Sequence, residues 1–294
     1  MSIIFGTTNT DGSGSSHNLD ESNGITITDG VNSTNGVNSI VTEDGLLHSI
    51  AVNADEWNGA DNKEIRIDEN ADYIRVDDFV DVEITNGAEN GFSHIEILNA
   101  KRGQIDTTAG DSDDSIVIGV NSNNDHWEND FNIETGSGSD MIKMMNVNNS
   151  KYTEFDIDSG EGNDTVDVSE LEIAAKSSQL RHVDGGEGLD VLVTNGDATI
   201  DFEGFEVVEG AGFDSTLSLD SDLIANNADL ELGLVVYNID VEIEADYTVT
   251  EITDAQAEYL DELGYEADDF TALTVTTDDG EYSVLTDDSS YAVA

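Results

Sequence analysis

The chain has 294 residues, in which 66 Asp and Glu outnumber nine Lys and Arg, for a formal net charge of −57. A field of this sign repels phosphates, which makes nucleic acid and anionic membrane surfaces poor partners. The absence of cysteine excludes a disulfide scaffold, and no apolar run approaches the roughly 20 residues that span a bilayer.

Short alternating segments predict strands along the whole chain. High net charge with few aromatic residues is typical of disorder, but the hydrophobic residues, 37% of the total, are not scattered. They recur as alternations such as ITIT (25–28), EIRI (64–67) and DVEIEADYTV (240–249). We therefore expect an all-β chain whose acidic charge is neutralised on folding, with divalent cations as the obvious candidates.

Residues 1–100 are interpreted as an N-terminal β region with degenerate coils. The start, MSIIFGTTNTDG, has no basic stretch and only a short apolar one, so we expect no secretory signal peptide. The strand-like SIIFGTT (2–8) pairs either with its own chain or with a neighbouring molecule. Several residues of this region keep parts of a glycine and aspartate repeat that is complete only after residue 100, so we expect strands with weak ion binding here. These parts are Ile65, Asp72, Ile74 and Val76, and the segment NGAENG (86–91).

Five segments within residues 101–220 repeat one pattern of small residues, an Asp and a strand. They are TAGDSDDSIVI (108–118), ETGSGSDMIKM (134–144), DSGEGNDTVDV (158–168), DGGEGLDVLVT (184–194) and VEGAGFDSTLS (208–218). The aligned acids recur at a nearly constant interval, and they are Asp114, Asp140, Asp164, Asp190 and Asp214. Self-similarity at one period indicates stacked repeats.

Mostly apolar residues flank each Asp in the same register. Two positions after it stand Ile116, Ile142, Val166, Leu192 and Thr216. Seven positions before it stand Thr107, Ile133, Ile157, Val183 and Val207, and nine before it Ile105, Phe131, Phe155, Arg181 and Phe205. Spacings of two place these residues on one face of a strand. We predict a parallel β-solenoid of about 25 residues per coil, with aliphatic and aromatic ladders inside.

Stacking brings the aligned Asp side chains together, because parallel strands lie about 4.8 Å apart. Two unit charges at about 5 Å repel by roughly 1 kcal/mol in water and by about 3 kcal/mol at an effective dielectric constant of about 20. A Ca²⁺ ion between successive loops reverses this sign, since it takes about six to eight oxygen ligands, and glycine lets the backbone aim carbonyls at it. The alternative is a tight turn whose Asp caps backbone amides without a metal.

The five segments resemble the RTX (repeats-in-toxin) family, whose repeat is Gly-Gly-x-Gly-x-Asp-x-U-x, with U a large aliphatic residue. The resemblance covers the five segments between positions 108 and 218. It implies Ca²⁺ held between stacked turns by the Asp side chains and by carbonyls of the glycine loop. The loop glycines include Gly136, Gly138, Gly160, Gly162, Gly186, Gly188, Gly210 and Gly212. One motif per coil, where the family runs its repeats in tandem, favours a wider coil with a single ion-binding edge.

Residues 221–294 are interpreted as a small C-terminal cap. TDAQAEYLDELG predicts a helix at 253–263, with a capping box between Thr253 and Gln256 and a stop at Gly264. Two strands follow, and the Asp-Gly pair at 279–280 is typical of a type I′ hairpin.

The last residues have two interpretations. In the first interpretation these residues only close the solenoid. They are Asp287-Asp288, followed by Tyr-Ala-Val-Ala at 291–294. By resemblance to RTX proteins, acidic residues followed by apolar ones serve as an uncleaved signal for type I export.

We expect no catalytic site. The five histidines are isolated in the sequence and are assigned no role: His17, His48, His94, His126 and His182. Arg181 stands at an apolar position, which indicates either local salt-bridging or a register shift, or a polar insertion in a binding groove. Wide β-solenoids include polysaccharide lyases, but their acidic sugars call for more basic residues than nine.

These features favour a secreted, calcium-binding structural protein that folds and self-assembles outside the cell into a surface layer, matrix or filament. In a cytosol poor in Ca²⁺ the acidic chain stays expanded, and outside the cell even weak sites fill. The absence of proline and cysteine removes slow isomerisation and wrong disulfides. The alternatives are a calcium-dependent adhesin or ice-binding module, a polysaccharide-active enzyme, and a halophile's cytosolic protein, which explains the charge but not the repeat.

Overall fold

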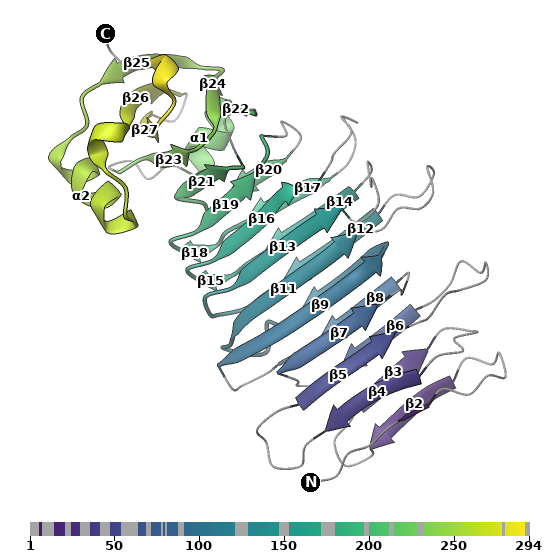
Figure 1. Ribbon diagram of the computed structural model, residues 1–294. Helices are drawn as coiled ribbons and strands as arrows, with labels where there is room; N and C mark the ends of the chain where they lie inside the picture. Colours follow the sequence, from purple (N-terminus) through teal and green to yellow (C-terminus); the bar gives the residue numbers. More distant parts are fainter. Residues whose placement is uncertain are drawn as a thin grey trace.

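The computed structural model is a parallel β-solenoid of about six turns with about 24 residues per coil, which confirms the predicted fold class. Figure 1 shows the coils stacked as successive rungs, with a small cap at the C-terminal end. The structure describes residues 6–7, 15–20, 25–29, 36–41, 48–53, 64–68, 72–77, 79, 81–87, 91–120, 129–146, 153–171, 180–196, 200–211, 215–227, 232–277 and 280–291.

Two long sheets form the walls of the solenoid in this described part. The first sheet contains, in spatial order, β1 (Gly6–Thr7), β4 (Gly36–Val41), β5 (His48–Asn53), β7 (Tyr73–Asp77), β9 (Phe92–Ala100), β11 (Asp113–Val120), β13 (Met141–Asn146), β16 (Thr165–Glu170), β19 (Val191–Thr194), β21 (Val207–Gly210), β23 (Leu234–Tyr237), β27 (Glu281–Thr286), β26 (Thr271–Thr276) and β25 (Asp246–Thr250). The second contains β2 (Ser15–Asp20), β3 (Ile25–Asp29), β6 (Glu64–Asp68), β8 (Asp81–Thr85), β10 (Arg102–Asp106), β12 (Asn129–Glu134), β14 (Thr153–Asp158), β17 (Arg181–Asp184) and β20 (Asp201–Glu203).

Two short parallel pairs complete the strands. The strands β15 (Glu161–Gly162) and β18 (Glu187–Gly188) pair within the glycine turns, and β22 (Thr216–Leu219) pairs with β24 (Asp240–Ile243) near the C-terminal end. From β5 to β23 the first sheet is parallel, so each coil repeats the direction of the one before it. The predicted order of strand, glycine turn and strand is thus confirmed for the central coils.

The core consists of aligned apolar columns between the two sheets. On the first sheet the column is Ile74, Ile95, Ile116, Ile142, Val166, Leu192 and Val208. On the second it is Ile67, Ile84, Ile105, Ile133, Ile157, Val183 and Phe202. These side chains are almost completely buried. Each coil therefore buries its inner face against its neighbours, which is how a repeat too small for its own core is stabilised.

The coils differ in length more than the sequence spacing indicates. The aligned positions on the first sheet are His94, Ser115, Met141, Thr165, Val191, Val207 and Val235. Among these coils the one from Val191 to Val207 is the shortest and the one that follows it is the longest. The predicted alignment of the fifth copy is therefore wrong. Val207 pairs with Val191 on the first sheet, whereas Val183 on the second sheet pairs with Phe202.

The first copy is also displaced from its predicted register. Ile105 lies beside Ile133, and Gly103 lies beside Phe131, two residues away from the alignment that put Ile105 with Phe131. A Cβ at Gly103 would lie 2.9 Å from the Phe131 ring, so the glycine makes room for the aromatic side chain of the next coil. The first turn is longer by two residues as a result.

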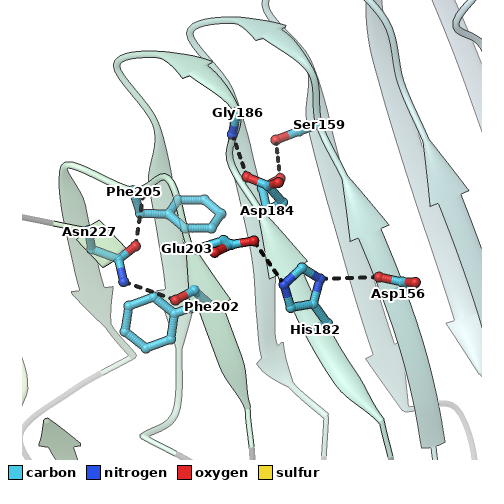
Figure 2. Close-up of polar contacts among 9 residues, drawn as sticks. All are labelled: Asp156, Ser159, His182, Asp184, Gly186, Phe202, Glu203, Phe205 and Asn227. Atoms are coloured by element: carbon cyan, nitrogen blue, oxygen red, sulfur yellow. Dashed lines mark hydrogen bonds and ion pairs between the residues drawn. The ribbon is translucent and has the colours of Figure 1, made fainter. Parts of the chain in front are cut away.

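A short helix that the sequence did not predict closes the second sheet. This helix, α1 (Ser221–Asn227), packs against β20 at the end of the solenoid. Its Asn227 amide donates to the Phe202 carbonyl at 2.9 Å and accepts from the Phe205 amide at 3.0 Å (Figure 2). The side chain therefore satisfies backbone groups where the ladder of this sheet ends.

The predicted helix in the cap is present as α2 (Asp254–Leu263). The Thr253 hydroxyl accepts from the Gln256 amide, the Gln256 side chain accepts from the Thr253 amide, and Gly264 ends the helix in the left-handed region with φ 87°. The helix lies on the outer face of the first sheet, where Tyr259 and Leu260 pack with Phe270 and neighbouring apolar residues.

Replacing Thr253 with Ala is expected to lower the free energy of unfolding by about 1 kcal/mol, because the capping hydrogen bond to the helix N-terminus is lost. Urea unfolding followed by circular dichroism measures this change. Thr253→Ser, which keeps the hydroxyl, is the control and should retain most of the stability. Equal losses in both variants would contradict a capping role.

The predicted hairpin is present in the described strands. The strands β26 and β27 are antiparallel, and the Thr277 amide donates to the Gly280 carbonyl at 2.8 Å beyond their last pair, Thr276 with Glu281. Asp279 of the predicted turn lies outside the described residues. The predicted strand DVEIEADYTV is divided into β24 and β25, which lie in different sheets.

The two ends of the chain are attached to the solenoid as far as the structure describes them. Gly6 and Thr7 pair antiparallel with β4 of the same chain, whereas the first residues of the predicted edge strand lie outside the described part. Asp287 accepts from the Asn238 amide at 3.0 Å, and Asp288 accepts from the Val241 amide at 3.0 Å. These two acids therefore hold the cap in the folded chain. No helix in the described part is long and apolar enough to cross a membrane.

Candidate metal site

The glycine turns connect the second sheet to the first, and successive turns lie unusually close together. A Cβ placed on Gly162 would lie 1.4 Å from the Gly138 carbonyl oxygen, and one on Gly188 would lie 1.4 Å from that of Gly162. The φ angles of Gly162 and Gly188 are 149° and 152°, a region that L side chains rarely adopt. Glycine is thus required both by the turn and by the approach of the next coil.

The aspartates of the repeat form a buried column just after these turns, which we call the aspartate ladder. It consists of Asp114, Asp140, Asp164 and Asp190, each at most 3% exposed. One carboxylate oxygen, Oδ1, accepts a hydrogen bond from the backbone amide of the Asp one coil earlier. The distances are 2.7 Å for Asp114 to Asp140, for Asp140 to Asp164 and for Asp164 to Asp190. The structure thus brings together four of the five predicted aspartates.

Both ends of the aspartate ladder continue into residues that the sequence did not predict. Ser93 donates its hydroxyl to Asp114 at the N-terminal end, as does Ser112 at 2.8 Å. At the other end the Asp190 amide donates to Glu206 at 2.8 Å, so Glu206 takes the place predicted for the next aspartate. Glu206 was missed because the coil between Val191 and Val207 is so short. Asp214 and Gly212 lie outside the described residues.

The second carboxylate oxygen, Oδ2, is buried and has no hydrogen-bond partner in Asp140, Asp164 and Asp190. Hydroxyl groups lie on the other side of the turn, five positions before the aspartates, but their protons are used elsewhere. Thr135 donates to the Ser159 carbonyl at 2.7 Å, and Ser159 donates to the Gly185 carbonyl at 3.0 Å. The Thr135 and Ser159 hydroxyls still lower the pKa of Asp140 and Asp164, but burial outweighs them. The aspartate ladder therefore holds a row of buried oxygen atoms without a hydrogen bond of good geometry, which is costly for a carboxylate.

Burial changes the titration of these carboxyl groups. It raises the pKa of Asp140 and of Asp164 to about 6, although the hydrogen bonds from the Asp114 and Asp140 amides act in the opposite direction. It raises the pKa of Asp190 to about 7, and repulsion from Asp164 and Glu206 adds to the effect of burial. Near neutral pH the folded protein thus carries poorly compensated charge inside the turns.

The atoms around the turn are of the kind that a hard divalent cation such as Ca²⁺ prefers. The groups around the turn that could bind a cation are all oxygen ligands: carboxylates, the hydroxyls of Thr107, Thr135 and Ser159, and backbone carbonyls. The hydroxyl oxygen of Thr107, like the three Oδ2 atoms, is buried without a partner. In the described part of the chain no three His, Asp or Glu side chains converge on one point. A cation between two coils would therefore draw on two carboxylates and complete its shell with carbonyl and hydroxyl oxygens.

The predicted glycine ligands have different environments. The Gly136 and Gly160 carbonyls accept the Glu161 and Glu187 amides of the next coil at 2.8 and 2.9 Å. The Gly138 and Gly162 carbonyls point at the glycine of the next coil, and Gly186 and Gly188 occupy the same turn positions one coil later. Gly210 ends β21 outside these turns, and its carbonyl accepts from the Asn238 side chain at 2.9 Å.

Arg181 lies in the core and does not line a groove. Its side chain is 1% exposed, it remains in register with Phe155, and its Nε donates to the Thr153 carbonyl at 2.9 Å. The predicted register shift and the predicted binding-groove insertion are therefore both wrong. The guanidinium satisfies the backbone inside the solenoid, which explains why a charged residue is tolerated in an aromatic column.

His182, to which the sequence analysis gave no role, forms part of a polar group on the outer face of the second sheet. Figure 2 shows its ring between Asp156 and Glu203, and the distances are 3.2 Å from Nδ1 to Asp156 Oδ1 and 3.4 Å from Nε2 to Glu203 Oε1. The separation of Asp156 and His182 by one coil of the repeat is the signal that could have found this pair.

A shallow hollow of about 140 Å³ adjoins His182, lined by Asn132, Glu134, Asp158 and Asp184 among others. Ligand pockets usually enclose about 300–1,000 Å³, so this hollow is small for a sugar substrate. The outward residues here are mainly acidic, and the in-register row Thr85, Asp106, Glu134, Asp158, Asp184 and Glu203 contains a single threonine. This face therefore lacks the flat threonine ladder that an ice-binding interpretation needs.

Comparison with known proteins does not assign the chain to a family. It matches no protein-family model, no curated protein and no solved structure. The interpretation of the site therefore depends on its own geometry and on the motif of the glycine turns.

Proposed function

We propose that this chain is a secreted, calcium-binding structural protein whose solenoid is completed by Ca²⁺ along the aspartate ladder. Asp114, Asp140, Asp164 and Asp190 supply carboxylate oxygens, and the turns from Gly136 to Gly188 supply carbonyls. The ion contributes positive charge inside the turns, where it offsets the repulsion between successive carboxylates. The fold then depends on Ca²⁺ in the same way that small metal-dependent domains do.

The observation that carries this proposal is the row of buried, unpartnered Oδ2 atoms in three consecutive coils. Capping of backbone amides accounts for Oδ1 in each aspartate and leaves Oδ2 unexplained. An isolated buried carboxylate in an apolar medium costs many kcal/mol, so it is protonated, hydrated or bound to a cation. A net charge of −57 adds a long-range preference for cations.

Export of an expanded chain followed by folding outside the cell is consistent with the same features. Sites with dissociation constants of about 10⁻⁴ to 10⁻³ M stay empty at cytosolic Ca²⁺ and fill outside the cell. We therefore propose type I export, with the C-terminal residues as the signal, and extracellular assembly into a layer, matrix or filament. The acidic outer face around His182 favours this structural role over a catalytic one, because its hollow is small.

Asp164→Asn separates calcium binding from amide capping. The variant keeps an oxygen that can accept the Asp140 amide but removes the charge that binds a cation. We expect Ca²⁺ to increase the β-sheet signal and melting temperature of the wild type, measured by circular dichroism at neutral pH. In the variant the Ca²⁺ concentration at half-response should rise by about tenfold or more, equivalent to at least about 1.4 kcal/mol.

The matched control is Asp130→Asn, which removes the same charge from an exposed residue of the same region. It should respond to Ca²⁺ as the wild type does. Amide capping without a metal predicts instead that neither protein responds to Ca²⁺ beyond the effect of ionic strength, which an equal ionic strength of NaCl measures. That result would overturn the calcium proposal.

A further inference from the structure

The strand β25 ends the first sheet and is open to solvent. It is the last strand in the order β23-β27-β26-β25, and it pairs antiparallel with β26 on one side. All five of its residues are exposed, from Asp246 to Thr250. It lies at the opposite end of the molecule from β2 (Figure 1), and at the opposite end of the first sheet from β1. Its outer backbone groups are therefore available to another strand.

The apolar layer beneath this sheet continues to the open edge. Tyr247 pairs with Val275, and Val249 pairs with Leu273, so each pair shares one face of the sheet. Val275 and Leu273 are completely buried, whereas Tyr247 and Val249 remain 43% and 38% exposed. The Tyr247 ring also packs edge-on against Tyr291, with ring centroids 5.5 Å apart. The core layer thus extends to the edge strand, where the described part of the chain covers it only partly.

The sequence of β25 is complementary to itself in an antiparallel pair centred on Thr248. In that register Tyr247 of each molecule faces Val249 of the other, an aromatic and β-branched pair that stabilises neighbouring strands. Thr248 faces its own copy, and Asp246 faces Thr250, so no two carboxylates lie directly opposite each other. At the other end of the sheet, the described residues of β1 are Gly6 and Thr7, which pair with β4.

We propose that β25 is the surface through which two copies of this chain join, by antiparallel pairing of their β25 strands across a two-fold axis. This inference rests on the proposed function, because it specifies one contact of the proposed assembly. A two-fold contact uses the same surface on both molecules and closes on itself, so it yields a dimer with the N-terminal ends far apart. Ca²⁺ favours it by reducing the repulsion between two acidic molecules.

Single cysteines test the pairing directly, since the chain has none of its own. Opposed Cα atoms in an antiparallel pair lie about 4.5–5.5 Å apart, within the range of about 4.4–6.8 Å that a disulfide spans. With Ca²⁺ and a mild oxidant, Thr248→Cys should form a covalent dimer. Thr276→Cys, at an exposed position of the neighbouring strand β26, is the matched control and should not. Its two copies would lie three strand spacings apart across the sheet, about 14 Å, and would also be offset along the strands.

Sedimentation equilibrium measures the uncrosslinked association. With Ca²⁺ the wild type should associate at least to dimers, and Val249→Asp should weaken this association by about tenfold or more. Phe92→Asp, a change at another exposed apolar residue, should not weaken it. A wild type that is monomeric at all concentrations, or one that associates without crosslinking at Thr248→Cys, would overturn the inference. If the pairing fails but the wild type still responds to Ca²⁺ in circular dichroism, the calcium proposal stands. If dimers form but circular dichroism shows no response to Ca²⁺, only the calcium proposal is contradicted.

Discussion

Replacing Gly162 with Ala is expected to lower the free energy of unfolding by more than about 4 kcal/mol, or to prevent folding, an effect at the upper limit for single substitutions. The new Cβ would lie 1.4 Å from the Gly138 carbonyl oxygen. The atom that the new Cβ would meet belongs to the backbone, so no flexible side chain can move to relieve the overlap. The turn is also held at φ 149°, which disfavours Ala independently. Urea unfolding in excess Ca²⁺ measures the loss.

Gly280→Ala is the matched control for backbone strain. Gly280 has a φ of 154°, close to that of Gly162, but a Cβ there meets no atom within 4 Å. This variant should lose only the cost of an unfavourable φ, about 1–3 kcal/mol. Similar losses in the two variants would contradict the requirement for close stacking of the glycine turns.

The second large effect is on pH dependence. In metal-free buffer the folded protein is expected to lose several kcal/mol of stability between pH 5 and pH 8, and the cause is the aspartate ladder. Burial raises the pKa of Asp140 and Asp164 to about 6 and that of Asp190 to about 7, from an ordinary value of 3.8. The folded state therefore holds protons that the unfolded chain has released. This contribution is complete below about pH 4 and is lost as the pH rises through 6 to 7.

The urea midpoint as a function of pH measures this dependence. Each carboxyl that keeps its proton only in the folded state makes the unfolding equilibrium constant rise about tenfold per pH unit. Asp190→Asn removes one such group and should flatten the curve, whereas Asp130→Asn removes an exposed charge and should leave its slope nearly unchanged. A midpoint that rises steadily from pH 5 to pH 8 in the wild type would contradict buried, raised-pKa aspartates.

Much of the fold could be predicted because one physical requirement repeats along the chain. A parallel coil with a tight turn needs glycine where the chain reverses and apolar residues two apart in the strands, and both signals recur from Asp114 to Asp190. The alternation of the strands and the capping box of Thr253 and Gln256 are local patterns, so they were predicted correctly.

The errors arose where coil length or tertiary contacts decide the structure. The sequence near Val207 fits two registers, and only the packing of an unusually short coil selects the pairing with Val191. The helix α1 has only seven residues and is held by Asn227 against β20, which no local pattern indicates. Arg181 is accommodated by a carbonyl of the preceding coil. In each case the missing information is a contact with a neighbouring coil, which lies close in space but distant along the chain.

The aspartate ladder could be predicted in part. The spacing of the repeats predicted that the aspartates share one edge, and Asp114, Asp140, Asp164 and Asp190 do so. It did not predict that Oδ1 accepts a backbone amide while Oδ2 lacks a partner, because that division depends on the rotation of a side chain inside the turn. The hydroxyls of Thr135 and Ser159 could have been recognised by their constant distance of five residues before the Asp.

A crystal structure of the protein grown in CaCl₂, with anomalous difference density recorded at a long X-ray wavelength, examines the ladder atom by atom. We expect calcium peaks between neighbouring coils, about 2.3–2.6 Å from the Oδ2 atoms of residues such as Asp140 and Asp164. Density explained by water or by nothing beside these oxygens, in crystals of a fully folded protein, would mean that the carboxylates are compensated without a metal.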